Sequence, residues 1–323
     1  MNVDNPLISI CIPTYNRCSI LEKTLFSICD QDIFKNTDFV EIVISDNNSS
    51  DDTRSVCSKY VDKYGKKVKY YKNCKNIYDK NIEKALSKGT GVLLKLNNDT
   101  LSHQPESLSI MLSIVHKYSD VRPLIFFLNR SLPGDNERCF KNMDGFMSAI
   151  SYYSTWIGGF AIWKEDYLTI NDFCEYSDRQ LMQTDVLFKN SLQKSIYVVC
   201  NHRLFNVLSV DLSKGGYDFL KVFVDNYFNL LCKYESLGVI TTNTCVNEKK
   251  KMMICHVCSW AARSKEAYYA TFDVDKHWCY LKRYFGRDYR VVILYSVKYF
   301  KDRIIYRLKK RRLFAEFTDK CAK

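Results

Sequence analysis

Glycine and proline are both scarce in this chain of 323 residues, which contains 11 glycines and 5 prolines. This composition excludes a collagen-like protein and argues against long flexible linkers and low-complexity segments. No run of about 18 uninterrupted apolar residues is present, so we expect no membrane-spanning helix. The first residues have no basic segment followed by a long apolar run, so we expect no secretory leader and a cytoplasmic protein.

The two common glycine-rich phosphate-binding motifs are also missing. The sequence has no G-x-G-x-x-G after its first strand-like run and no G-x-x-x-x-G-K-[ST] anywhere. Backbone amides of such loops are therefore not available to hold phosphate. A nucleoside diphosphate could instead be held through a divalent cation, for which a carboxylate offers hard oxygen ligands.

Cysteine is comparatively frequent, with 14 residues, but the cysteines stand singly in apolar stretches such as "ISICI" and "YVVCN". This pattern is typical of buried thiols in a reducing compartment and not of a disulfide framework. Cys255, His256 and Cys258 form a C-x-x-C without a second pair at zinc-finger spacing, so we interpret them as helix core.

Short β-rich runs alternate with helical patterns in the first two thirds of the chain. We predict strands at 7–12, 39–45, 67–71, 91–96 and 123–129, with helices at 19–31, 51–65 and 78–89 and from about residue 105. Ser19 and Glu22 have the spacing of a capping box, and Gly65 is expected to end the second helix. The alternation predicts an α/β fold with a mostly parallel sheet covered on both faces.

Polar loops follow three of these predicted strands. They are "PTYNR" (13–17), "DNNSSDD" (46–52) and "NND" (97–99). Because ligands bind where the carboxyl ends of parallel strands converge, we expect the three loops to share one edge of the sheet. Asp99 would then be available to Mg²⁺ or Mn²⁺, and Asp46 to the ring N–H groups of a base. The alternative is that these loops are only turns, with Ser50 or Asp51 capping the next helix.

These segments, together with "NIYDKN" (76–81), resemble the nucleotide-binding half of family 2 glycosyltransferases with the GT-A fold, particularly those that build bacterial surface polysaccharides. The resemblance covers about residues 6–205. It implies that Asp46 contacts the base and that Asp99 binds the metal, Mn²⁺ or Mg²⁺. Asn97 replaces the first acidic residue of the family's D-x-D-like motif. The other nucleotide-binding residues that the resemblance implies are Pro13, Tyr15, Arg17, Asn76, Asp79, Asn81 and Asn98.

Downstream residues complete the site that the resemblance implies. The family has an acidic catalytic pair at the start of a helix where this chain has Thr184 and Asp185, so Asp185 is the candidate general base. His202 is a candidate second metal ligand, with a surface histidine as the alternative. Gly158 and Gly159 form a pair where an acceptor could approach closely, unless they only form a bulge in a strand. Gly215 and Gly216 could act as hinges of a loop that closes over the donor, or only form a turn.

The sequence changes character after about residue 216, where helical patterns dominate. Residues 281–312 contain twelve lysines and arginines against two aspartates, which accounts for most of the chain's net charge of +12. Apolar residues at 293, 297, 300, 304 and 308 have helical spacing, so we predict a basic amphipathic helix on an anionic membrane surface. A helix packed on the core is the alternative, and no motif supports nucleic-acid binding.

The sequence therefore predicts a GT-A nucleotide-sugar-binding and catalytic domain at 1–216 and a helical, basic region at 217–323 for acceptor or membrane association. The resemblance implies an inverting transferase that uses a nucleotide-diphosphate sugar, with UDP favoured. Its acceptor would be a lipid-linked saccharide in O-antigen or capsule synthesis, at the cytoplasmic face of the membrane. A sugar-phosphate nucleotidyltransferase and a catalytically inactive GT-A-like binding protein remain the alternatives.

Overall fold

In the computed structural model, the described parts of the chain divide into two compact units. One unit comprises Met1–Val210 and Leu230–Cys245, and the other comprises Asp211–Asn229 and Val246–Lys323. A domain boundary after residue 216 stays a prediction. The structure describes residues 6–131, 133–171, 173, 180–208, 214–215, 218–257, 270–271, 277–286, 290, 294, 298 and 301.

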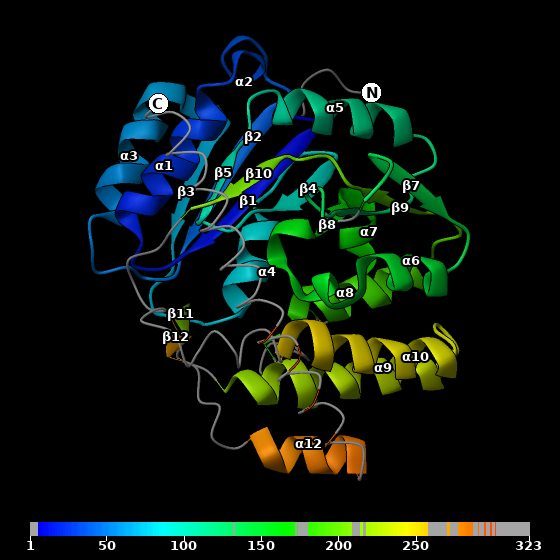
Figure 1. Cartoon of the computed structure of the whole chain (residues 1–323). Helices are drawn as coiled ribbons and strands as arrows, with labels where there is room; N and C mark the ends of the chain where they lie inside the picture. The colour runs from blue at the N-terminus through cyan, green and yellow to red at the C-terminus, as the bar shows by residue number, and fades with distance from the viewer. Residues whose placement is uncertain are drawn as a thin grey trace, which may run out of the picture. The chain divides into compact units, whose positions relative to one another are not determined.

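The main sheet of the first unit is mostly parallel, which confirms the predicted α/β class (Figure 1). Its strand order is β3-β2-β1-β4-β8, with parallel pairing from β3 to β4 and antiparallel pairing of β8 with β4. The strands are β1 (Ile8–Thr14), β2 (Val40–Asp46), β3 (Val68–Lys72), β4 (Leu93–Leu96) and β8 (Ala161–Trp163).

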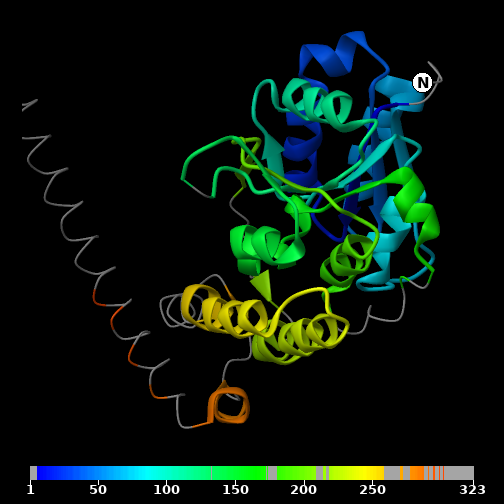
Figure 2. The same ribbon diagram turned by 90° about the vertical axis from the view of Figure 1, so that its right-hand side faces the viewer.

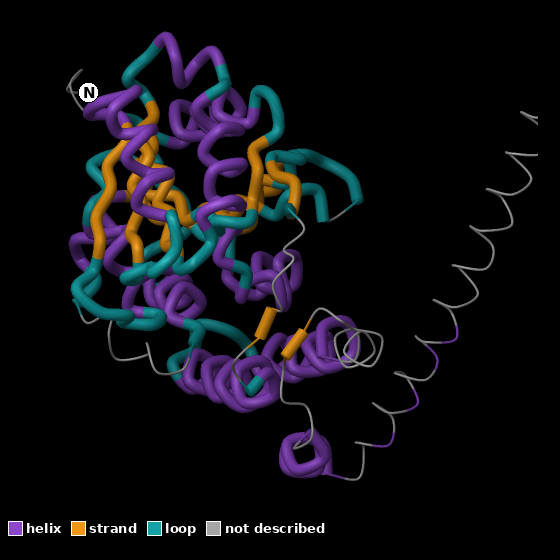
Figure 3. The backbone as a smooth tube through the Cα atoms, turned by 90° about the vertical axis from the view of Figure 1, so that its left-hand side faces the viewer, coloured by secondary structure: helices purple, strands orange, loops and turns teal. Residues whose placement is uncertain are grey.

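Helices cover both faces of this sheet, which is why its central strands are apolar at nearly every position. Ile10 of β1 and Ile42 of β2 belong to one buried cluster with side chains of α1 (Cys18–Cys29), α3 (Thr53–Tyr64) and α5 (Ser107–Tyr118). The opposite face meets α4 (Lys80–Ser87), where Asn81 Nδ2 donates to the Ser45 carbonyl oxygen at 2.9 Å. Figure 3 shows these strands as an orange layer between purple helices.

The helix ends confirm one sequence prediction and correct another. Gly65 follows α3 with a φ of 55°, a conformation that favours glycine, so it ends the helix as predicted. The capping box at Ser19 and Glu22 is wrong, because α1 begins at Cys18. Asp51 from the next loop caps α1 instead, with its Oδ2 accepting from the Cys18 amide at 2.9 Å.

A second small sheet and a two-stranded ladder complete the first unit. The sheet has the order β6-β9-β7, with β6 (Leu124–Phe127), β9 (Tyr197–Cys200) and β7 (Glu137–Phe140). In the ladder, β10 (Phe205–Val207) runs antiparallel to β5 (Leu101–His103). The remaining elements are α2 (Asp32–Asn36), α6 (Met143–Ile150), α7 (Lys164–Thr169), α8 (Met182–Ser191), and the 3-10 turns η1 (Gly65–Lys67), η2 (Ser151–Thr155) and η3 (Ile157–Gly159).

Helices dominate the remainder of the described chain, as predicted. After the π-helical segment η5 (Lys221–Asn226), α9 (Tyr227–Ser236) turns back into α10 (Thr242–Lys251), and the two helices lie side by side in Figures 1 and 2. The other elements are the π-helical segment η6 (Met252–Val257), α12 (His277–Phe285), and β11 (Lys214–Gly215), which pairs in parallel with β12 (Ala270–Thr271).

The structure describes little of the basic segment at 281–312. Arg283 of α12 pairs with Asp225 at 3.5 Å, and Arg290, Lys298 and Lys301 are exposed. The apolar residues at 293, 297, 300, 304 and 308, and the basic residues at 309–312, lie outside the described residues, as does most of the loop at 209–219. None of the helices that the structure describes is long and apolar enough to cross a membrane.

Candidate active site

The polar loops after β1, β2 and β4 meet at one edge of the sheet, as predicted. Parallel register places Thr14, the last residue of β1, beside Asp46, the last residue of β2. The two loops are then joined, because the Asn16 amide donates to Ser49 Oγ at 2.8 Å. This edge therefore has several polar groups fixed within a small region by backbone pairing and by direct hydrogen bonds.

Asp99 anchors the third loop to the first. Its side chain is only 4% exposed, and its Oδ2 accepts from Thr14 Oγ1 at 2.9 Å. Its Oδ1 pairs with the Arg17 guanidinium at 2.8 Å, and its carbonyl oxygen accepts from Thr24 Oγ1 at 2.8 Å. Arg17 is 38% exposed, so the ion pair lies at the boundary between the protein and solvent.

Asn97 and Asn98 have different surroundings in the same loop. Asn97 is fully buried, and its Oδ1 lies 3.2 Å from His103 Nε2. Burial, and then the charge of Lys95, lowers the pKa of His103 to about 3, so the imidazole is neutral and donates through Nε2 to Asn97. In contrast, Asn98 Oδ1 is buried without a hydrogen-bond partner among the described residues.

These residues offer the kind of oxygen ligand that a divalent cation takes. Asp99 and the unpartnered Asn98 Oδ1 are hard oxygen donors of the type that Mg²⁺ and Mn²⁺ prefer. Asn97 is turned into the fold, and Arg17 already neutralises Asp99. A metal ion would therefore have to displace Arg17 from Asp99 or share that carboxylate with it.

Asp46 is fully buried and has protein partners on both carboxylate oxygens. Oδ1 accepts from the Ser49 amide at 2.8 Å, and Oδ2 accepts from the Tyr70 hydroxyl at 2.6 Å. Burial, and then the Asp46 carboxylate, raises the pKa of Tyr70, so the phenol stays protonated as the donor. Asp46 thus shapes its own loop, and the contact with a base that we predicted stays a prediction.

The "NIYDKN" turn is attached to the end of β2 by asparagine side chains. Asn76 Oδ1 accepts from Asn47 Nδ2 at 2.7 Å, and Asn81 is tied to Ser45. Burial raises the pKa of Asp79, between them, to about 6. Asn47 was missed in the sequence, although its place directly after Asp46 was the available signal. The turn is therefore rigidly placed at the edge where the resemblance implied base or ribose contacts.

Exposed aromatic rings flank this edge. Tyr15, which follows β1, is 45% exposed, and Tyr78 in the "NIYDKN" turn is 80% exposed. Pro13 is partly buried at the end of β1. Aromatic faces in such positions can stack on a planar base. Tyr78 was missed in the sequence, although an aromatic residue within the "NIYDKN" turn was the available signal.

Side chains of the protein itself pack closely against Gly158 and Gly159, at the positions where an acceptor was expected to approach. A Cβ at Gly159 would lie 2.2 Å from Phe126 Cζ, and one at Gly158 would lie 2.5 Å from Leu101 Cδ1. Both glycines are buried in the 3-10 turn η3. The alternative of a bulge within a strand is therefore wrong. Close packing explains why glycine is needed at both positions, and acceptor binding at this pair stays a prediction.

Asp185 lies in the first turn of α8 and is 1% exposed. Its Oδ1 accepts from the Tyr234 hydroxyl at 2.7 Å and from Lys233 Nζ at 3.3 Å, and its Oδ2 lies 3.8 Å from Lys189 Nζ. Thr184 is turned inward and donates to the Ser154 carbonyl oxygen at 3.1 Å. Two lysine cations therefore lie beside the Asp185 carboxylate, and its role as the base stays a prediction.

The structure does not bring His202 to Asp99. In the β10–β5 ladder, Phe205 pairs with His103, and the Leu208 amide donates to the Thr100 carbonyl oxygen. Leu208, at the far end of β10 from His202, is thus the described residue of this segment that lies next to the "NND" loop. His202 precedes β10 and lies at the opposite end of the ladder, so the antiparallel register separates the two candidate metal ligands.

Comparison with known proteins identifies the segment that contains these loops. Residues 9–130 match the model of glycosyl transferase family 2. This segment of the chain is similar to family 2 glycosyltransferases. Asp46, Asp99 and the "NIYDKN" turn all lie within the matched segment, so the edge described above belongs to the part of the chain that is similar to this family.

Two curated relatives match parts of the chain. GalNAc(5)-diNAcBac-PP-undecaprenol beta-1,3-glucosyltransferase of Campylobacter jejuni is 46% identical over 21% of this chain and 20% of its own length. Abequosyltransferase RfbV of Salmonella typhimurium is 34% identical over 36% of this chain and 34% of its own length. The alignments thus span about a fifth and a third of these relatives.

Two solved structures share the fold over most of the chain. TarS of S. aureus, as a fragment in complex with UDP-GlcNAc, has a TM-score of 0.57 and 14% identity, covering 77% of this chain and 73% of that one. A mannosyltransferase of Pyrobaculum calidifontis in complex with GDP-Man and Mn²⁺ has a TM-score of 0.51 and 13% identity, covering 91% and 87%. These similarities confirm the GT-A fold.

One further charged residue of the family 2 segment was missed in the sequence. Lys95 of β4 is fully buried two residues before Asn97 of the "NND" loop, and its Nζ donates to the carbonyl oxygens of Leu96 and Gly158. The rings of Phe127 and Phe205 lie 5.3 and 5.1 Å from Nζ. Burial lowers the pKa of Lys95 from 10.5 to about 7, because the charged form loses its hydration.

We predict that Lys95 makes stability rise above neutral pH. Between pH 7 and 10.5 the unfolded chain binds the lysine proton and the folded chain does not, so the free energy of unfolding increases with pH. Relative to Lys95→Met, the free energy of unfolding of the wild type, measured by urea unfolding, should increase by up to about 1.4 kcal/mol per pH unit. Lys84→Met, at an exposed position of α4, should show no such pH-dependent difference. Parallel pH curves for the wild type and Lys95→Met would refute the prediction.

Proposed function

We propose that this chain transfers a sugar from a nucleotide-diphosphate sugar to a saccharide acceptor, with inversion at the anomeric carbon. The observation that carries this proposal is the convergence of the three strand-end loops, with Asp99 and Arg17, in the family 2 segment. The names of the curated relatives include a glucosyltransferase acting on an undecaprenol-linked saccharide and an abequosyltransferase. A lipid-linked acceptor agrees with the first of these names, we keep bacterial surface polysaccharide synthesis as the proposed setting, and UDP stays the favoured nucleotide.

The proposed reaction uses the charges of Asp185, Arg17 and Asp99. The acceptor oxygen forms a bond to the anomeric carbon while the bond from that carbon to the diphosphate breaks. Asp185 accepts the hydroxyl proton, and Arg17 lies where it can neutralise charge on the departing nucleoside diphosphate. Asp99 and Asn98 would hold Mn²⁺ or Mg²⁺, which when bound supplies further positive charge to that leaving group.

Two alternatives to this function make different predictions. A sugar-phosphate nucleotidyltransferase would form a new nucleotide-sugar bond from a nucleoside triphosphate, and the family 2 match disfavours it. An inactive binding protein would hold nucleotide without turnover. Asn97 and Thr184 are both bonded into the fold in place of acidic residues, so they supply no additional charge to the site.

Asp99→Asn should remove the metal-dependent part of nucleotide binding, because it replaces the charged oxygen donor but keeps an acceptor for Thr14. Thermal shifts with UDP, GDP, CDP and dTDP, each with and without Mn²⁺, should show selective stabilisation of the wild type that the variant loses. Turnover should fall by about a hundredfold or more. Asp62→Ala, at an exposed position of α3, is the control. Unchanged Mn²⁺ dependence in Asp99→Asn would place the metal elsewhere.

Asp185→Asn should leave nucleotide binding unchanged and lower kcat by about a hundredfold or more, because the amide cannot accept the proton. The Tyr234 hydroxyl can still donate to the new Oδ1, so the fold should persist. Lys233→Gln is the matched variant, since it keeps the carboxylate and should shift the pH profile of kcat without abolishing turnover. Equal losses of donor affinity and turnover in Asp185→Asn would indicate a binding role.

We also propose that the basic segment at 281–312 places the enzyme at an anionic membrane surface. Changing Lys309, Lys310, Arg311 and Arg312 to glutamine should weaken sedimentation with anionic vesicles by up to about 1 kcal/mol per charge, and salt should reduce the wild-type binding. Four exposed lysines of the family 2 segment, Lys23, Lys59, Lys63 and Lys84, provide the control variant. Vesicle binding that does not change with the four substitutions would contradict this role.

A further inference from the structure

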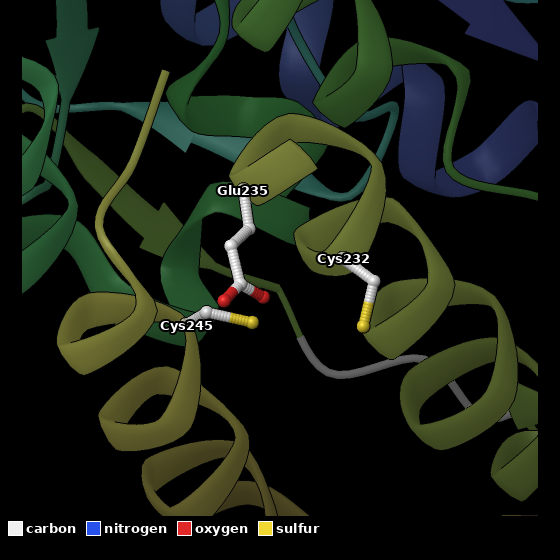
Figure 4. A group of neighbouring side chains, drawn as sticks. All are labelled: Cys232, Glu235 and Cys245. Carbon is white, nitrogen blue, oxygen red and sulfur yellow. The ribbon is translucent and has the colours of Figure 1, made fainter. Parts of the chain in front are cut away.

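Two cysteines and a glutamate converge where α9 meets α10. Cys232 and Glu235 are three residues apart on α9, so they share one face of the helix. Cys245 lies in the first turns of α10. The two sulfur atoms and a carboxylate oxygen lie within 4.8 Å of one another, and Figure 4 shows the side chains extending toward a common region.

The turn between the two helices holds these side chains in place. The Thr241 amide donates to Asp144 Oδ1 of α6 at 2.9 Å, and the Cys245 amide donates to the Thr241 carbonyl oxygen at 2.9 Å. Gly238 has a φ of 70°, which allows the tight reversal after α9. The cluster is therefore assembled by the local fold before any ligand is bound.

We propose that Cys232, Glu235 and Cys245 bind a zinc ion. Thiolate and carboxylate are both zinc ligands, at about 2.3 Å and 2.0–2.2 Å, and three protein ligands leave a fourth position for water. Thiolates disfavour Mg²⁺ and Ca²⁺, which prefer oxygen. The two thiols release one proton each as the zinc–sulfur bonds form. Within the part of the chain that the structure describes, this is the one such group of three ligands, and it shares no residue with the Asp99 site.

Zinc at this position would affect the geometry around Asp185. The two residues between Cys232 and Glu235 are Lys233 and Tyr234, which donate to Asp185 Oδ1. The Tyr234 ring also stacks on Phe188 of α8 at a centroid distance of 4.7 Å. A metal that fixes both flanking positions of α9 would hold Lys233 and Tyr234 against α8, so we assign the site a positioning role.

Cobalt titration of the reduced, metal-free full-length protein tests this proposal. One equivalent of Co²⁺ should produce thiolate-to-cobalt charge-transfer absorption and tetrahedral d–d bands, and Zn²⁺ should displace it. Cys232→Ser and Cys245→Ser should each weaken or remove the charge-transfer band. Glu235→Gln should retain the band but bind Co²⁺ more weakly. Cys74→Ser and Cys139→Ser, at exposed cysteines outside the cluster, should match the wild type.

A second measurement on the wild type alone avoids dependence on variants that fail to fold. Zn²⁺ should protect Cys232 and Cys245 from alkylation, mapped by mass spectrometry, while Cys74 and Cys139 stay reactive. Zinc should also raise the melting temperature, and a chelator should reverse that change. The proposal is overturned if cobalt gives no charge-transfer band, if zinc leaves both cysteines reactive, or if the native protein contains a Cys232–Cys245 disulfide.

Discussion

The buried carboxylate of Asp99 is the charge that holds together the edge where the loops after β1, β2 and β4 meet. A carboxylate with a 4% exposed side chain is stable only if hydrogen bonds and a cation replace its hydration, and here Thr14 and Arg17 do so. Because Thr14 ends β1 and Asp99 follows β4, these contacts fix the relative position of two strand-end loops. Arg17 is partly exposed, so its contact with Asp99 is the one that a bound diphosphate or cation can reorganise.

The two other carboxylates assigned to the site are also held by neighbouring donors. Asp46 accepts from the Ser49 amide and the Tyr70 hydroxyl, and Asp185 accepts from Tyr234 and Lys233. Ser49 lies in the same loop as Asp46, but Tyr70, Tyr234 and Lys233 belong to other elements, so these carboxylates connect elements as well as presenting charge. A substitution at any of the three positions therefore changes packing and chemistry together, which is why near-isosteric amides separate the two effects better than alanine.

The region around α9 extends this dependence beyond the sheet. Residues 233 and 234 reach Asp185, and residues 232 and 235 on either side of them face Cys245. A ligand at the three-residue cluster would thus constrain the helix that orders the candidate base. The two inferred metal sites differ in chemistry, because Asp99 and Asn98 supply only oxygen, whereas the α9–α10 cluster supplies two thiolates.

The sequence by itself determined the α/β class, the order of the strands and helices and the convergence of three polar loops, because strand alternation and parallel pairing follow from local patterns. The positions of Asp46 and Asp99 at strand ends made them candidates, and the family resemblance added Asp185 and His202. Only the tertiary structure decided which side chains these residues contact. Three of the contacting residues lie far along the chain from their partners: Tyr70, Asn47 and Tyr234. The fourth, Lys95, lies in an apolar stretch without a local signal. The antiparallel register of β10 and β5 separates His202 from Asp99. The side chains of Leu101 and Phe126 occupy the space beside Gly158 and Gly159. Register and packing both depend on contacts between distant segments.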